Sequence, residues 1–211
     1  MIRDTRKTQE YFNEYIAYQK ERITKFSSLK SSLDGAKVVQ CNEMIAHFMK
    51  DLFVAMYSAN ASQDELKETF NEYLAMVKGV SQLSYSECVD IVAICIMLDI
   101  SIDSLSDIKA FDDETDDLIK LLIGLDDLTG DLKFPEYYKP FYEYLMQKST
   151  YEDFVGYVEN EWYNSSEDFY WFDSHKNEND TYTGYWCWLA AACLKITKAS
   201  NPDRSAFIPI F

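Results

Sequence analysis

Apolar residues recur at helical spacing through the N-terminal part of the chain. The first 134 residues contain no proline, and Gly35 and Gly79 each fall where an apolar period ends, which is typical of helix ends. Phe12, Ile16 and Ile23 are spaced so that they share one helix face. The pattern predicts a first helix over about 4–33 and a second helix after Gly35.

Two serine–glutamate pairs mark further helix starts. Ser62 with Glu65, and Ser84 with Glu87, have the spacing of a capping box. The run 88–100 that follows the second pair is apolar at nearly every position and β-branched at several, so a buried strand is the alternative there. The cap and the length of the run favour a buried helix.

The C-terminal part continues with short helical segments. We expect one helix that Asp112 caps, a Tyr-rich helix that starts at Pro135 or Pro140, and one that Thr150 caps. The first should turn four leucines inward: Leu118, Leu121, Leu122 and Leu125. A last, buried helix is predicted over 185–196, with Thr181 or Thr183 as its cap.

These elements predict an all-α fold, an antiparallel helical body with an irregular aromatic-rich loop before the last helix. The turn-rich stretch 126–134 is the best candidate boundary. We therefore expect an N-terminal helical half, 1–128, and a C-terminal helical half, 129–211, within one compact body.

Charge is the strongest global feature. The formal net charge is −16, and acidic residues dominate 112–131 and 149–180, whereas residues 1–31 are net positive. This distribution excludes nucleic acid as a direct ligand, because phosphate binding needs clustered Lys and Arg. It fits a basic partner, or a face that only keeps the protein soluble. No apolar run approaches a membrane span and the first residues lack a signal-peptide core, so we expect a cytoplasmic protein without membrane contact.

Few residues offer catalytic or metal chemistry. The five cysteines lie in apolar helical segments without CxxC spacing, which predicts reduced core residues. Asp173 and His175 have the i, i+2 spacing that metal-dependent hydrolases use, but a site needs three or four ligands and the other histidine, His47, lies within a predicted helix. An Asp–His hydrogen bond that fixes the loop is the structural alternative. We expect no metal, no cofactor and no enzymatic activity.

Residues 159–173 alternate aromatic rings with carboxylates, as recognition surfaces do, although a small core can also be closed by such rings. Carboxylates attract a basic partner, and an aromatic side chain buried on docking supplies much of the binding energy. The candidate contact residues of this segment are Glu159, Glu161, Trp162, Glu167, Asp168, Trp171 and Asp173. The acidic run further upstream adds Asp112, Asp113 and Asp116.

The same region resembles the C-terminal half of PoNi-type immunity proteins, which neutralise PoNe-type DNase toxins delivered between bacteria. The residues that carry the resemblance are Glu161, Trp162, Tyr163, Asp168, Trp171, Asp173, His175, Lys176, Thr181, Tyr182, Gly184, Tyr185, Trp186 and the three alanines 190–192. The opening helix resembles the N-terminal half of the family less specifically. Leu189 stands where the family commonly has a carboxylate, and the tail 199–211 differs from its acidic turn.

The resemblance implies an all-α immunity protein without chemistry of its own, whose partner is a basic toxin, a DNase in that family. It also implies that His175, Thr181, Tyr182, Gly184, Tyr185 and Trp186 form a structural motif. The charge agrees with this function, since a DNase must be basic to hold DNA. A metal-dependent hydrolase built on Asp173 and His175 and a generic helical adaptor for a basic protein are the alternatives.

Overall fold

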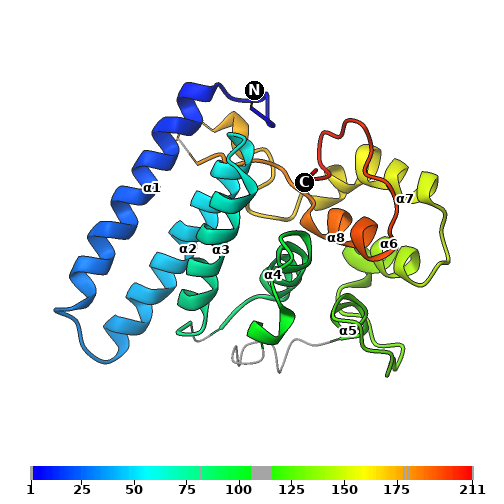
Figure 1. The fold of residues 1–211 in the computed structure, drawn as a ribbon, viewed down its shortest axis with the longest axis horizontal. Helices are drawn as coiled ribbons and strands as arrows, with labels where there is room; N and C mark the ends of the chain where they lie inside the picture. The colour runs from blue at the N-terminus through cyan, green and yellow to red at the C-terminus, as the bar shows by residue number, and fades with distance from the viewer. Residues whose placement is uncertain (1, 81, 106–115, 178, 180, 211) are drawn as a thin grey trace. The chain divides into compact units, whose positions relative to one another are not determined.

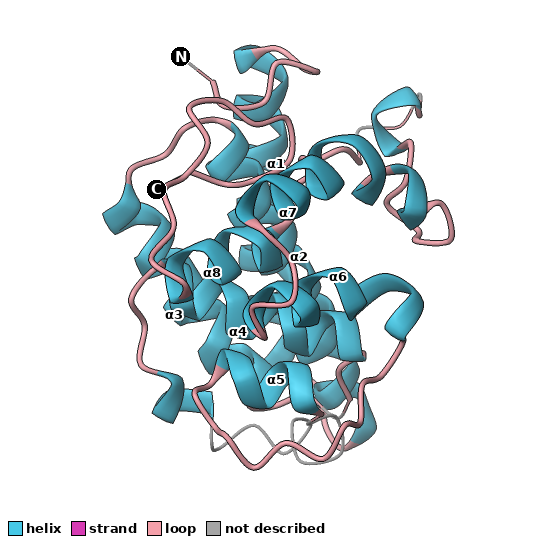
Figure 2. Ribbon diagram, turned by 90° about the vertical axis from the view of Figure 1, so that its right-hand side faces the viewer, coloured by secondary structure: helices cyan, strands magenta, loops and turns pink. Residues whose placement is uncertain are grey.

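A computed structural model describes residues 2–80, 82–105, 116–177, 179 and 181–210. Within these residues the protein is built from eight α-helices and short helical turns, and no strand occurs (Figures 1 and 2). The predicted all-α class is confirmed.

The chain divides into two compact units that are each assembled from separate stretches of sequence. Leaving aside residues 106–115, unit 1 comprises residues 1–83 and 173–184, and unit 2 comprises residues 84–105, 116–172 and 185–211. The division into two helical halves, 1–128 and 129–211, stays a prediction.

Unit 1 is built on three helices: α1 (Gln9–Lys30), α2 (Ala36–Ser58) and α3 (Gln63–Val77) (Figure 1). α1 and α2 form a hairpin that turns at Gly35, whose φ of 50° is open to glycine but strained for other residues. Phe53 of α2 and Phe70 of α3 are both buried, with ring centroids 5.0 Å apart. Apolar burial of this kind, rather than helix propensity, stabilises the helices.

Unit 2 contains α4 (Tyr85–Met97), α5 (Asp117–Leu122), α6 (Pro135–Leu145), α7 (Tyr151–Tyr157) and α8 (Trp188–Ile196). α8 packs against α4, α5 and α6, so this helix is surrounded within its unit (Figure 2). Its residues from Trp188 to Leu194 are all buried. The apolar run of α4 is helical and buried on all sides, so the helix predicted there is confirmed over the strand alternative.

The predicted caps agree with the structure in the first half of the chain and at Thr150. Ser62 and Ser84 each accept the backbone N–H of the glutamate three residues later, and each glutamate reaches back to the serine. Thr150 accepts the N–H of Asp153 at 3.2 Å, and Pro135 is the first residue of α6.

Three predicted details at the C-terminal helices are wrong. α8 begins at Trp188 and not at Tyr185, and the backbone N–H of Cys187, the residue before it, bonds to the Phe207 carbonyl oxygen at 2.8 Å. Cys187 therefore occupies the cap position, and neither Thr181 nor Thr183 caps the helix. α5 ends at Leu122, which leaves Leu125 exposed rather than inward.

The helix start predicted at Asp112 lies outside the described residues. The observed N-cap of α5 is Asp116, whose carboxylate accepts the Ile119 N–H at 3.0 Å. All five cysteines are free and buried, as predicted, and burial raises the pKa of the Cys95 thiol to about 12. A thiol held protonated in this way is a poor nucleophile.

Candidate partner-binding surface

The aromatic and acidic segment begins where helix α7 loses its regular geometry. The chain passes from α7 into a π-helix, Val158–Trp162, and then into the short 3-10 turn Asn164–Ser166. The Ser166 hydroxyl donates to the Trp162 carbonyl oxygen at 2.8 Å and fixes this junction. Each hydrogen bond of a π-helix spans one residue more than in an α-helix, so the side chains that follow point in a different direction. Such turns are frequent at functional sites.

Six rings of this region form an aromatic cluster in unit 2. Trp162 and Trp171 stack with centroids 5.5 Å apart, and Tyr163 stacks on Phe172 at 4.6 Å and on Phe207 at 5.5 Å. Phe169 joins the cluster through Trp171, with centroids 5.7 Å apart. All six rings are half-buried. The cluster therefore has the energetic role of a small core and still presents ring surface to solvent.

Tyr170 differs from the cluster although it lies within the same segment. Its side chain is 81% exposed, the highest value among the exposed large hydrophobic residues. Three carboxylates of the segment, Glu161, Glu167 and Asp168, are exposed as well. Asp168 accepts the Tyr137 hydroxyl at 2.9 Å, a contact that raises the pKa of that phenol. The exposed part of the segment thus combines one protruding ring with negative charge.

Glu159 has a different environment from these three acids. It is half-buried, and its carboxylate accepts the hydroxyl of Ser205 and, at 3.2 Å, the backbone N–H of Ala206. The Ser205 oxygen in turn accepts the N–H of Phe207 at 3.0 Å. Glu159 therefore holds the C-terminal tail in place.

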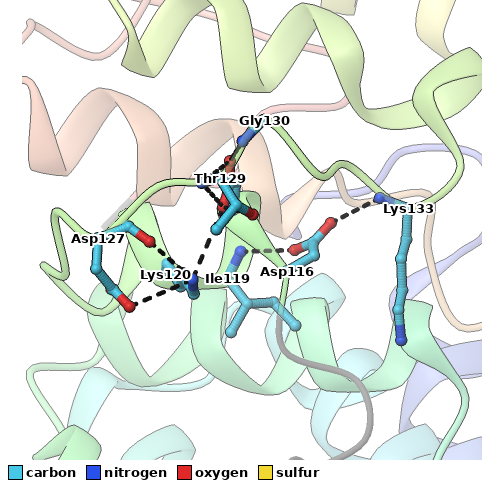
Figure 3. Close-up of polar contacts among 8 residues, drawn as sticks. Asp116, Ile119, Lys120, Asp127, Thr129, Gly130 and Lys133 are labelled. Atoms are coloured by element: carbon cyan, nitrogen blue, oxygen red, sulfur yellow. Dashed lines mark hydrogen bonds and ion pairs between the residues drawn. The ribbon is translucent and has the colours of Figure 1, made fainter.

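The acidic residues at the start of α5 also have internal partners (Figure 3). Asp116 is buried and accepts three hydrogen bonds: from the Ile119 N–H, from the Lys133 N–H at 2.9 Å and from the Tyr85 hydroxyl at 2.8 Å. These contacts fasten the loop after α5 to α4 and α5. Asp113 and Asp112, the other candidates of this run, lie outside the described residues.

Asp117, which the sequence did not single out, supports the same loop. Its buried carboxylate accepts the N–H of Thr129 at 3.0 Å and of Gly130 at 2.6 Å, and Lys120 lies 3.9 Å away (Figure 3). Burial raises the pKa of Asp117, but these N–H groups and Lys120 outweigh it, so the pKa lies below its ordinary value.

Asp173 and His175, the residues of the metal-site alternative, belong to unit 1. Asp173 forms an ion pair with Lys176 at 2.7 Å. Burial lowers the pKa of the His175 imidazole, although Asp173 acts in the opposite direction. Over the described part of the chain, no group of three or more His, Cys, Asp and Glu side chains is arranged to hold a metal ion.

The segment 181–184 is attached to unit 1 through hydrogen bonds. The fully buried Tyr182 donates its hydroxyl to the buried carboxylate of Asp4. Its backbone N–H donates to the Tyr11 hydroxyl at 3.1 Å, and the same hydroxyl donates to the Tyr182 carbonyl oxygen at 3.0 Å. Ser58 donates to the Thr183 carbonyl oxygen. Tyr182 is therefore a structural residue of unit 1.

The remaining residues of the motif lead the chain into unit 2. Gly184 has a φ of 133°, a conformation that L side chains rarely adopt, and Thr181 is exposed. Tyr185 and Trp186 are buried in the part of the chain that belongs to unit 2. Both side chains thus belong to the core of unit 2, and the motif that the family resemblance implies stays a prediction.

Comparisons with known proteins bear directly on this part of the chain. Residues 112–205 match the family model of PoNe immunity proteins (PoNi), C-terminal, which confirms the resemblance over this region. The matched region covers slightly less than half of the chain, and it is similar to a family described as immunity proteins. A search among curated proteins finds no match.

The fold also occurs in a solved structure. The crystal structure of protein PA2201 from Pseudomonas aeruginosa aligns with a TM-score of 0.69 over 94% of this chain and 84% of that chain, at 13% identity. At this identity the likeness concerns the fold alone. Among the described residues, no helix has the length and apolar character needed to cross a membrane.

Proposed function

We propose that this protein is an immunity protein that binds a DNase toxin and neutralises it by stoichiometric contact through an acidic surface. The observation that carries the proposal is the match of residues 112–205 to PoNe immunity proteins. These same residues contain 20 acidic and 8 basic residues, so they hold most of the net negative charge of the chain.

The charge suits a nuclease as partner for a physical reason. A DNase needs Lys and Arg side chains to bind the phosphate backbone of DNA. An acidic inhibitor is attracted to the same surface, which accelerates association, and its carboxylates compete with phosphates for the same cations. Blocking or locking the toxin in this way requires no catalytic residue in the inhibitor. We place the encounter in the cytoplasm, where DNA is the target.

Among the predicted contact residues, Glu161, Glu167 and Asp168 are the best placed because they are exposed. Trp162 or Trp171 serves as the aromatic anchor, since both rings keep part of their surface in solvent. We propose indirect roles for the other predicted residues. Buried Asp116 and half-buried Glu159 hold the loop after α5 and the C-terminal tail in place, whereas Asp112, Asp113 and Asp173 contribute negative charge.

Co-expression with the toxin encoded beside this gene tests the proposal. We expect the chain to rescue growth and to co-purify with the toxin domain in a fixed ratio. Failure to bind that domain and to protect the cell would contradict the immunity function.

The anchor assignment has its own test. The double substitution Trp162→Ala and Trp171→Ala should weaken toxin binding by about 2 kcal/mol or more, which is about 30-fold in Kd. Because the two rings stack on each other, urea unfolding of the variant must be measured alongside. Unchanged affinity in a folded variant would show that neither ring is the anchor.

A further inference from the structure

The backbone holds Tyr170 in a defined outward position. The Phe172 N–H donates to the Phe169 carbonyl oxygen at 3.0 Å, which places Tyr170 and Trp171 at the centre of a turn. Phe169 and Trp171 on either side stack on each other with centroids 5.7 Å apart and are half-buried, while Tyr170 between them is 81% exposed. The ring therefore projects into solvent from a turn whose neighbouring rings pack on each other, so a partner can reach it.

The stretch of sequence that contains Tyr170 carries charge of one sign. No Lys or Arg occurs from 149 to 175, whereas six acidic residues occur from 149 to 172. Two of them, Glu167 and Asp168, are exposed and lie within three residues of Tyr170. The Cα atoms of residues 168 and 170 are at most about 7 Å apart, because consecutive Cα atoms are 3.8 Å apart. A cation on the face of this ring would gain from the ring and from both carboxylates.

Arginine fits this combination better than lysine. Its planar guanidinium can lie flat on an aromatic ring and still direct two N–H groups at a carboxylate. An ammonium group is more strongly hydrated and offers a point charge without the plane. Single exposed aromatic residues are common on protein surfaces, and Tyr170 differs from them by lying in a turn beside two exposed carboxylates.

We propose that Tyr170 is a specificity-determining contact of this surface and that its ring, together with Glu167 and Asp168, receives an arginine side chain of the partner. The inference rests on the proposed function, because it names the chemistry by which the same surface selects its toxin.

The experiment measures the Kd of the full chain for the catalytically inactivated toxin domain by calorimetry at physiological salt. Tyr170→Leu removes the π system but keeps an apolar side chain and should weaken binding about 30-fold, whereas Tyr170→Phe should stay within threefold. Tyr18 of unit 1, a 52% exposed tyrosine, provides the matched control, and Tyr18→Leu should change the Kd less than twofold. All three variants should unfold at the same urea concentration as the unchanged chain.

A scan of single Arg→Lys substitutions in the toxin identifies the partner of the ring. One of them should reproduce the loss and add little to it when combined with Tyr170→Leu, because both changes remove the same contact. Unchanged affinity of Tyr170→Leu, equal losses for Leu and Phe, or the absence of any coupled arginine would each overturn the inference while the proposed function stands. Absence of binding by the unchanged chain would overturn both.

Discussion

The two units of this protein differ in the balance of their charges. Unit 1 has 14 acidic and 12 basic residues in residues 1–83 and 173–184, whereas unit 2 has 18 acidic and 7 basic residues in its three stretches. Both units are helical and both bury apolar cores. The charge excess is therefore not a requirement of the fold, and it is concentrated in the unit that contains most of the region matching PoNe immunity proteins.

Within unit 2 the carboxylates divide into two groups. Asp116, Asp117 and Glu159 accept backbone or hydroxyl hydrogen bonds and fix the loop after α5 and the tail. Glu161 and Glu167 are exposed. An acidic residue of unit 2 can therefore either hold a loop in place or present negative charge to solvent, and the burial of its side chain distinguishes the two roles. The following predictions test this division and the contrast between the units.

The largest expected effect concerns Asp116. Asp116→Ala leaves the Ile119 and Lys133 N–H groups and the Tyr85 hydroxyl without their acceptor, so the free energy of unfolding should fall by about 3 kcal/mol. The matched exposed acid is Asp127, in the loop after α5 that Asp116 holds, and Asp127→Ala should change the free energy of unfolding by less than about 0.5 kcal/mol. Urea unfolding measures both; equal effects would refute the division between buried and exposed carboxylates.

A second prediction contrasts the units in binding. Neutralising three exposed acids of unit 2 should slow toxin association about tenfold at low salt, because electrostatic attraction accelerates encounter. The three substitutions are Glu161→Gln, Glu167→Gln and Asp168→Asn.

The control removes the same charge from exposed acids of unit 1: Glu14→Gln, Glu68→Gln and Glu72→Gln. Stopped-flow measurements at two salt concentrations should show a smaller change for this variant. If both variants slow association equally, the association rate depends on the net charge of the chain and not on the surface of unit 2.

Removing a helix cap should lower the free energy of unfolding by the same amount in both units. Ser62 of unit 1 and Ser84 of unit 2 form capping boxes with the same geometry, since each accepts an N–H at 3.3 Å. Ser62→Ala and Ser84→Ala should each lower the free energy of unfolding by about 1 kcal/mol. A large difference between the two losses, measured by urea unfolding, would indicate that one cap has a role beyond its helix.

The smallest expected effect is a difference in pH dependence. In unit 1 burial lowers the pKa of His175, so the unfolded chain binds this proton more readily and the free energy of unfolding should fall as the pH drops below about 6.5. His175→Gln should flatten this dependence between pH 7 and 5, measured by urea unfolding at each pH.

Asp117 of unit 2 supplies the control. Its pKa is lowered in the folded state, so its stabilising effect is present above a pH of about 4 and is lost below it. Asp117→Asn should therefore leave the slope between pH 7 and 5 unchanged. If it removed that slope, the assignment of the slope to His175 would be wrong.

Local features of the fold could be predicted from the sequence. The capping boxes at Ser62 and Ser84, the buried helix α4 and the buried cysteines depend on residues close together in the chain, whose spacing is visible. Helix ends that depend on distant contacts could not be predicted. At the start of α8 the Cys187 N–H bonds to the carbonyl oxygen of Phe207, and no local pattern in the sequence indicates this contact.

The candidate surface could be located but not resolved into its parts. The alternation of rings and acids indicated the segment, yet the exposure of Tyr170 results from a turn between two stacked rings. The carboxylate of Glu159 accepts a hydrogen bond from the hydroxyl of Ser205, which lies 46 residues later in the chain. Contacts between residues far apart in the chain depend on tertiary packing, so composition and spacing alone do not predict them.

The attachment of Tyr182 limits how this protein can be divided or recombined. A fragment that ends at residue 83 would keep α1 to α3 but would lack the hydroxyl that Asp4 accepts and the backbone groups that Tyr11 bonds. A chimera that joins this N-terminal part to the C-terminal part of a relative meets the same requirement. Its two parents must agree at these three positions, so the stretches that form unit 1 are expected to be inherited together.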